Sequence, residues 1–233
     1  MNPLIELTNV SKTYKKRSVI ANISFTVPLG KIIGIVGENG SGKSTILKMI
    51  AGLLQPTTGT VTVNGENAHR RISKHVSYLS DRDSFYPFFT VREAIAYQAS
   101  QFSDFNLAKA EEIMAYMALD PDKKISALSK GNRGRLKIVL TLARNVPYLL
   151  MDEPLSGLDP MVRHAIVKGM ISYLDLETQT LIMTSHEISE IEPILDSFIA
   201  IKDGALVRKT EVEHLHESEG LGITDWMKKA YLE

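Results

Sequence analysis

Residues 31–54 combine three segments that together leave few choices of fold. The apolar run Lys31-Ile-Ile-Gly-Ile-Val36 has the length of a buried strand. A glycine-rich turn follows, and then Thr45–Leu54, in which apolar side chains recur at helical spacing. A strand that passes through such a turn into a helix N-terminus creates an anion site, because free N–H groups and the helix dipole point at the turn.

The turn itself, Gly37-Glu-Asn-Gly-Ser-Gly-Lys-Ser44, fits the pattern G-x-x-x-x-G-K-S/T. Loops of this kind wrap nucleotide phosphates with backbone N–H groups, and they need glycine because a Cβ forbids their backbone angles. The lysine reaches the β- and γ-phosphates, and the serine hydroxyl coordinates Mg²⁺. A glycine-rich turn without a ligand is the alternative. The expected phosphate contacts are Gly37, Glu38, Asn39, Gly40, Ser41, Gly42, Lys43, Ser44 and Thr45.

Composition excludes several classes of protein. The 27 basic residues equal the 27 acidic ones, without the basic bias of a nucleic-acid binder, so we expect no nucleic-acid partner. The absence of cysteine excludes disulfides and thiolate metal sites and fits a reducing cytoplasm. The N-terminal residues lack the pattern of a secretory signal, and no apolar stretch approaches the roughly 18 residues that span a bilayer. If the protein acts at a membrane, we expect a partner chain to bring it there.

The hydrophobic pattern predicts an α/β protein with a mostly parallel sheet. Strand-like segments at Tyr148–Met151, Thr180–Thr184 and Ser197–Ile201 follow a helical pattern, and further helical stretches separate the first two, which is typical of parallel strands. Asp203-Gly204 is expected to close a last hairpin.

An antiparallel β subdomain is expected at the N-terminus. Leu4–Tyr14 and Ser18–Val27 alternate apolar and polar residues on either side of a basic turn. Thr60–Val63 is expected as another edge strand that ends in the hairpin-type turn Asn64-Gly65. His75–Ser80 is expected as a short strand.

Between about Phe85 and Leu128 the pattern changes to helices, at Val91–Phe102 and Leu107–Leu119. This predicts a helical subdomain inserted into the α/β frame. We expect a nucleotide-binding domain over residues 1–205, followed by a short, mostly helical tail at 206–233. One stripe of the insert, which we interpret as core, consists of Ala110, Ile113, Met114 and Met117.

Two carboxylates, Asp152 and Glu153, follow the apolar strand that begins at Tyr148. Ligands collect at the carboxyl ends of parallel strands, and phosphoryl transfer needs a carboxylate for Mg²⁺ and a group that orients the attacking water. We assign the first role to Asp152, directly or through water, and the second to Glu153; carboxylates that merely start a helix are the alternative. His186 ends another apolar strand, where it could contact the γ-phosphate and position Glu153, or be an ordinary histidine.

Tyr14 is a single aromatic residue after the first strand. It is interpreted either as a stacking platform for adenine or as an ordinary strand aromatic.

With these residues the chain resembles the ATP-binding subunit of an ABC transporter over nearly all its length. Leu128-Ser-Lys-Gly-Asn132 stands where that family carries its signature, L-S-G-G-Q. Leu155-Ser-Gly-Leu-Asp159 matches the S-A-L-D loop, and His186 matches the switch histidine. The resemblance implies a RecA-like P-loop core, ATP hydrolysis, and a head-to-tail dimer. Each of two ATP molecules would then contact the phosphate loop of one subunit and Ser129, Gly131 and Asn132 of the other.

Two positions depart from the family pattern. Lys130 replaces a signature glycine and could extend a cation toward phosphate or, as we prefer, point into solvent. Asp81 stands where the family has a glutamine that contacts Mg²⁺ and the attacking water. Aspartate keeps an oxygen for the metal but loses the amide donor, so we hypothesise that Asp81 keeps the metal contact and alters coupling. Arg133 and Arg135 are interpreted as a solvated basic helix face rather than as phosphate contacts.

The resemblance implies a peripheral subunit on the cytoplasmic face of the membrane, paired with a separate transmembrane permease. Aromatic residues from Phe85 to Phe89 are candidates for a groove that receives a permease helix, or for packing inside the subdomain. The L-S-K-G-N signature with Asp81 is similar to Gram-positive exporters of antimicrobial peptides or phenol-soluble modulins, so export of amphipathic peptides is the narrower hypothesis. An importer subunit and a soluble ATP-dependent regulatory switch are the alternatives, and intact Glu153 and His186 argue against the switch.

Overall fold

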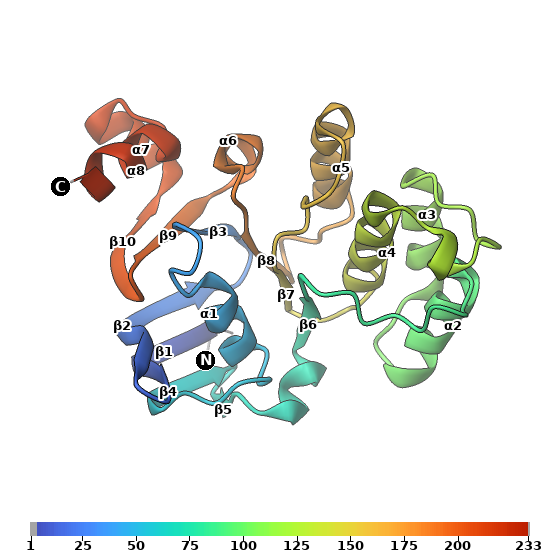
Figure 1. Ribbon diagram of the computed structural model, residues 1–233, viewed down its shortest axis with the longest axis horizontal. Coiled ribbons are helices and arrows are strands. Elements are labelled where there is room, and N and C mark those ends of the chain that lie inside the picture. The colour runs from blue at the N-terminus through green and yellow to red at the C-terminus, as the bar shows by residue number, and fades with distance from the viewer. Residues whose placement is uncertain (1–3, 233) are drawn as a thin grey trace.

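The computed structural model describes residues 4–232 and contains a six-stranded sheet with the order β10-β9-β3-β8-β7-β6 (Figure 1). Neighbours from β9 to β6 are parallel, and β10 is antiparallel to β9, which confirms the mostly parallel sheet. Strands β3, β7 and β8 are buried along their whole length, as expected for a sheet covered on both faces. The strands are β3 (Ile32–Val36), β6 (Val76–Leu79), β7 (Tyr148–Met151), β8 (Thr180–Thr184), β9 (Ser197–Lys202) and β10 (Ala205–Glu211).

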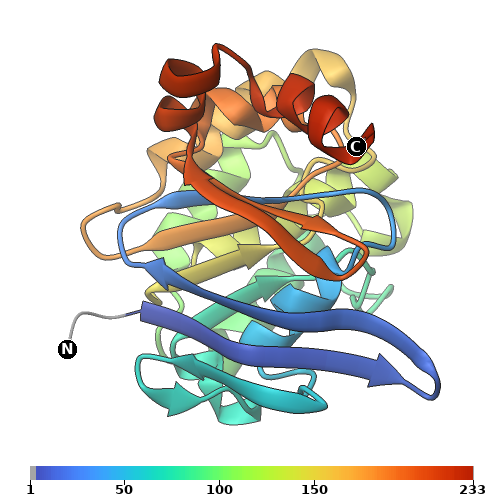
Figure 2. The same cartoon turned by 90° about the vertical axis from the view of Figure 1, so that its left-hand side faces the viewer.

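The antiparallel subdomain is a second sheet with the order β2-β1-β4-β5. Its blue hairpin, β1 and β2, crosses the molecule below β10 in Figure 2. The expectation that Thr60–Val63 forms an edge strand was wrong, because β4 pairs with β1 on one side and with the short β5 on the other. The strands are β1 (Leu4–Tyr14), β2 (Arg17–Pro28), β4 (Thr58–Val63) and β5 (Glu66–Asn67).

Helix α1 (Lys43–Ile50) is buried between the two sheets. Its apolar face packs into one cluster with inward side chains such as Ile5 of β1 and Ile35 of β3. Apolar burial of this kind contributes about 25 cal/mol per Å². It fixes the helix N-terminus, and with it the turn at residues 37–44, against the end of β3.

The helical subdomain is confirmed on the right of Figure 1, where α2 (Val91–Gln101) and α3 (Leu107–Tyr116) lie beside α4 (Lys130–Leu142). Thr90 and Glu93 form a capping box that fixes the start of α2. The expected stripe is core: Ala110, Ile113 and Met117 are buried and Met114 packs against them. The remaining helices before the tail are the short η1 (Arg70–Lys74), η2 (Ile125–Ala127), η3 (Glu192–Ile194) and α6 (Ile188–Ile191), and the longer α5 (Pro160–Ser172).

The expected helical tail contains α7 (Val212–Glu219) and α8 (Ile223–Leu232). These helices pack back onto the domain: Ile223 and Trp226 are buried, and the Trp226 ring lies 5.4 Å from that of Phe198 in β9. Residue 206 lies inside β10, and the expected domain boundary there stays a prediction. Within residues 4–232 no helix is long and apolar enough to cross a bilayer. The first three residues, which belong to the segment without a secretory pattern, lie outside the described part.

Candidate active site

The glycine-rich turn between β3 and α1 adopts backbone angles that require glycine. Gly37 and Gly42 have φ of 154° and 108°, and a Cβ on Gly37 would lie 2.2 Å from the carbonyl oxygen of Ile201. The buried Lys43 ammonium donates to the carbonyls of Gly37 at 2.8 Å and Glu38 at 3.0 Å, and thus holds the turn around its own cation. Burial lowers the pKa of Lys43, although the negative charges of two nearby carboxylates oppose the shift.

Asp152, at the end of β7, is fully buried and connects three neighbouring elements. Its Oδ1 accepts hydrogen bonds from the hydroxyls of Ser44 at 2.8 Å and Thr184 at 2.9 Å, and its Oδ2 from Tyr78 at 3.3 Å. Burial raises the pKa of Tyr78, so this hydroxyl stays a donor. The structure therefore brings Ser44 and Asp152 together, and their role as metal ligands stays a prediction.

The oxygen donors of Ser44 and Asp152 fit Mg²⁺, which takes oxygen ligands and is typically held by one or two protein groups together with substrate phosphates. Among residues 4–232 there is no group of three or more His, Cys, Asp or Glu side chains that could hold a metal ion by itself.

Glu153 adopts a left-handed backbone conformation, with φ of 51°, directly after Asp152. Its N–H donates to the hydroxyl of Thr184 at 2.9 Å, and its Oε2 accepts from the N–H of His186 at 3.1 Å. The Nε2 of His186 lies 3.2 Å from the buried Oε1, which accepts no hydrogen bond of good geometry within residues 4–232. Burial raises the pKa of Glu153, partly offset by the charges of His186 and Lys43.

A cavity of about 450 Å³ joins the Glu153–His186 pair to other residues singled out in the sequence. Asp81, just after β6, and Lys130, in the first turn of α4, line the same space. The family resemblance implied that Asp81 lies at the site, because the family's glutamine at this position contacts Mg²⁺ and the attacking water, and the metal contact of Asp81 stays a prediction.

Ser129 is the N-cap residue of α4 and accepts a hydrogen bond from the N–H of Asn132 at 3.2 Å. The side chain of Ser129 is exposed, while Gly131 packs close to the carbonyl oxygen of Gly157. In Figure 1 the start of α4 and the phosphate loop before α1 lie on opposite sides of strands β6 to β8. The two motifs are thus presented on separate parts of one subunit.

The family described as "ABC transporter" matches residues 20–156, which include the phosphate loop, the 128–132 motif and both carboxylates. The chain belongs to the ABC transporter family. It is an ATP-binding subunit of such a transporter, and the cassettes of this family hydrolyse ATP.

Two relatives and one solved structure illustrate the similarity. The bacitracin transport ATP-binding protein BcrA of Enterococcus faecalis is 34% identical over 93% of this chain and 72% of its own length. The Nod factor export ATP-binding protein I of Rhizobium etli is 35% identical over 86% of this chain and 66% of its own length. A dimeric ATP-binding cassette in a post-hydrolysis state, bound to ADP and Pi, is 24% identical and has a TM-score of 0.80. Its similarity covers 89% of this chain and 98% of that one, which supports the cassette fold.

The basic residues in and just after the signature do not all lie as the sequence interpretation expected. Arg133 and Arg135 do not form a solvated face. Arg133 donates to the carbonyl of Leu128 at 2.6 Å, and Arg135 to that of Met117 at 3.0 Å. Lys130 is exposed, as preferred, but its methylenes lie over Gly157, where an added Cβ would come within 2.8 Å of them.

Sequence reasoning missed Thr184 and Tyr78, which both bind Asp152. Thr184 is the last residue of β8, the strand that leads to His186. A hydroxyl residue at the end of a strand beside the site was the signal that could have identified it. Tyr78 gave none, because its partner comes from another strand. Tyr14, at the end of β1, is 47% exposed with the Lys12 ammonium 5.1 Å from its ring centre, and its role in adenine stacking stays a prediction.

Proposed function

We propose that this ABC ATPase powers export through a separate transmembrane permease, with amphipathic peptides as the class of substrate. The observation that carries the ATPase part is Glu153, whose carboxylate contacts His186 and whose backbone N–H donates to Thr184, close enough to Lys43 of the phosphate loop to feel its charge. The export part is supported by the Nod factor export relative, and the peptide part by the L-S-K-G-N signature together with Asp81. The protein would act at the cytoplasmic face of the membrane as a peripheral subunit.

In this proposal Glu153 orients and deprotonates the attacking water, and His186 holds Glu153 and contacts the γ-phosphate. The raised pKa of Glu153 suits a general base, because a carboxylate of higher pKa accepts a proton more readily. Lys43 would exchange its two carbonyl partners for phosphate oxygens. Ser44 and Asp152 would hold Mg²⁺, which supplies charge neutralisation on the phosphates when bound.

We propose that two copies, or this chain and a similar one, form a head-to-tail dimer. The phosphate loop and Ser129 lie apart within one subunit, so one ATP could touch both only if the second came from a partner. The similarity to a dimeric cassette supports this arrangement. ATP would close the dimer by bridging the two motifs, and hydrolysis would release it.

Asp81 is proposed as an additional metal-contacting group, because it shares the cavity with Glu153 and His186. Asp81→Ala is expected to raise the Mg²⁺ concentration for half-maximal ATP hydrolysis about tenfold, as losses around metal sites commonly do. Asp81→Gln, which restores the residue usual in the family, keeps an oxygen and is expected to change it less. Titrating Mg²⁺ at saturating ATP measures both. An unchanged Mg²⁺ requirement and transport-linked ATPase in Asp81→Ala would contradict the assignment.

The proposed permease contact is an aromatic groove of about 500 Å³ beside α2, lined by Phe85, Tyr86, Phe89 and Tyr97. Tyr86 is 48% exposed, with its ring centre 5.2 Å from that of Phe89 and 5.7 Å from that of Tyr97. Half-exposed aromatic residues around a hollow suit an amphipathic helix that inserts apolar side chains.

Tyr86→Ala is therefore expected to reduce the amount of permease that co-purifies with the tagged chain from detergent-solubilised membranes by about tenfold, the loss of a typical aromatic anchor. Leu107→Ala is the matched control, since Leu107 is a 47% exposed apolar residue of the same subdomain outside the groove. Equal recovery of the permease with both variants would contradict this contact.

Transport into inside-out membrane vesicles tests the proposed function. Vesicles that hold this chain and its co-purifying permease should accumulate a fluorescein-labelled amphipathic helical peptide when ATP is added. Vesicles with Glu153→Gln should not. Uptake only in right-side-out proteoliposomes with internal ATP would support an importer. Wild-type hydrolysis as slow as that of Glu153→Gln would support the regulatory switch.

A further inference from the structure

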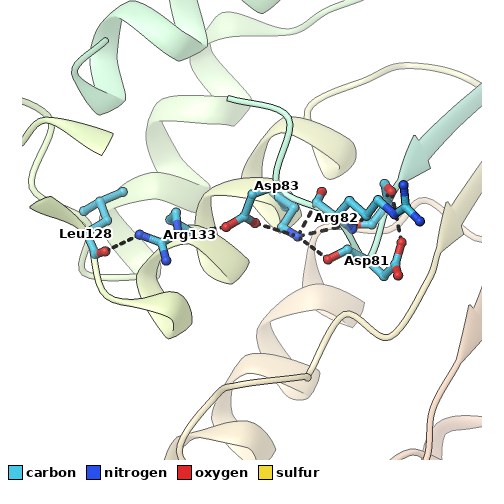
Figure 3. Close-up of polar contacts among 7 residues, drawn as sticks. Asp81, Arg82, Asp83, Leu128 and Arg133 are labelled. Carbon is cyan, nitrogen blue, oxygen red and sulfur yellow. Dashed lines mark hydrogen bonds and ion pairs between the residues drawn. The ribbon is translucent and has the colours of Figure 1, made fainter. Parts of the chain in front are cut away.

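The segment Ser80–Asp83, which follows β6, is attached to α4 by Lys137 and Arg133. The Nζ of Lys137 donates to the carbonyls of Ser80 and Asp81 at 3.1 Å and of Arg82 at 3.4 Å, and lies 3.0 Å from Oδ1 of Asp83 (Figure 3). Three carbonyls and a carboxylate thus converge on one ammonium group. This arrangement fixes the direction of the backbone that carries Asp81.

The second oxygen of Asp83 leads to the signature. Its Oδ2 accepts from Nε of Arg133 at 2.8 Å, and Nη1 of the same guanidinium donates to the carbonyl of Leu128, the first residue of the 128–132 motif. Arg133 and Lys137 are four residues apart on α4 and therefore lie on one face of the helix. Both side chains contact the carboxylate of Asp83, so a movement of the Ser80–Asp83 segment changes the contacts of Arg133 with Leu128 as well.

Burial distinguishes this network from an ordinary surface ion pair. The side chains of Lys137, Arg133 and Asp83 are 15%, 29% and 42% exposed, compared with 62% and 79% for Arg92 and Asp122, which form a pair on the same subdomain. Exposed pairs contribute little because water screens them, whereas partly buried, shared contacts are screened less. Burial alone would raise the pKa of Asp83, but hydrogen bonds and charge from Lys137 and Arg133 lower it overall.

We propose that Asp83 is a positioning residue that locks the Ser80–Asp83 segment to α4, so that Asp81 and Ser129 move as one unit. The consequence for hydrolysis rests on the proposed roles of Asp81 and Ser129, whereas the mechanical lock does not. A permease that shifts the aromatic segment after Asp83 would displace the signature through this lock.

Hydrogen exchange without nucleotide tests the lock itself. Two amides report on its ends: Arg82 N–H, bonded to the Ser80 hydroxyl, and Asn132 N–H, bonded to the Ser129 hydroxyl. Asp83→Asn is expected to accelerate exchange about tenfold in both segments, because local opening becomes easier. Asp122→Asn, the matched control, should change neither. Acceleration confined to residues 80–84 would overturn the proposal.

Steady-state hydrolysis tests whether the lock positions the site. Asp83→Asn should lower kcat about fivefold with KM for ATP nearly unchanged, and Asp83→Glu, which keeps the charge, should recover most of the rate. Asp83→Asn combined with Lys137→Met should be no slower than the slower single variant, since both break one network. Additive losses, or a loss seen only in KM, would overturn the positioning role. If exchange couples the two ends but Asp81→Ala leaves the Mg²⁺ requirement unchanged, only the proposed metal contact fails.

Discussion

Glu153→Gln is expected to lower kcat for ATP hydrolysis by about 10³-fold, within the range that a general base contributes. The amide keeps the size of the side chain and an oxygen to accept the N–H of His186, but it cannot take a proton from water. ATP affinity should stay within about threefold of wild type, because the substitution leaves Lys43 and the phosphate loop intact.

Single-turnover hydrolysis with and without the substitution measures this effect. Glu187→Gln is the matched control, because Glu187 is a neighbouring carboxylate with a 61% exposed side chain. Its activity should equal that of wild type. A Glu153→Gln variant that turns over ATP at the wild-type rate would remove Glu153 from the mechanism.

The same substitution should stabilise the nucleotide-free protein at neutral pH. Burial raises the folded-state pKa of Glu153 above its unfolded value, so its contribution to stability is fully present below the unfolded pKa and is lost as pH rises through the folded one. Glutamine carries no charge to desolvate. We therefore expect a Tm higher than wild type at pH 8, with the difference shrinking toward pH 4, in thermal unfolding followed by circular dichroism.

Lys43→Ala is expected to weaken ATP binding by about 10²-fold. Hydrogen bonds to charged groups contribute about 1.5–3 kcal/mol, and each 1.4 kcal/mol changes affinity tenfold. The buried ammonium at the centre of the turn has no replacement among the phosphate contacts, which are otherwise backbone N–H groups and hydroxyls.

Titration with a fluorescent ATP analogue measures the loss. Lys48→Ala is the control, since Lys48 lies in the last turn of the same helix. Lys43 also donates to two carbonyls of the loop, so the fold of the variant has to be checked. Circular dichroism should show that both variants fold. Undiminished affinity together with full turnover in Lys43→Ala would contradict the nucleotide site.

The elements of the fold could be predicted where the signal is local. The strands at Tyr148–Met151 and Thr180–Thr184 have the bounds expected from their apolar runs, and the first helix of the insert begins at Val91 as its spacing indicated. Strand neighbours were less accessible. The two-residue strand β5 leaves too short a pattern to recognise, and it converts β4 from an edge strand into an inner one.

Part of the candidate site could be predicted as well. The phosphate loop is contiguous, and Glu153 and His186 each lie two residues after a strand, β7 and β8, which pair side by side in the parallel sheet. Arg133 and Arg135 were misjudged because their partners, Asp83 and the carbonyls of Leu128 and Met117, belong to other segments. A basic stripe on a helix has the same pattern whether it faces water or a neighbouring loop.

The sequence by itself determined the glycine turn, the strand–turn–helix unit and the carboxylates at a strand end, because backbone angles and hydrophobic periodicity are encoded within a few neighbouring residues. Only the tertiary structure decided that Ser44 meets Asp152, that Thr184 supports Glu153, and that Asp83 joins the Ser80–Asp83 segment to α4. These pairs are far apart in sequence, and their distances depend on strand order and helix packing. Strand order and helix packing are set by the burial of the whole core, and no short segment of the sequence encodes them.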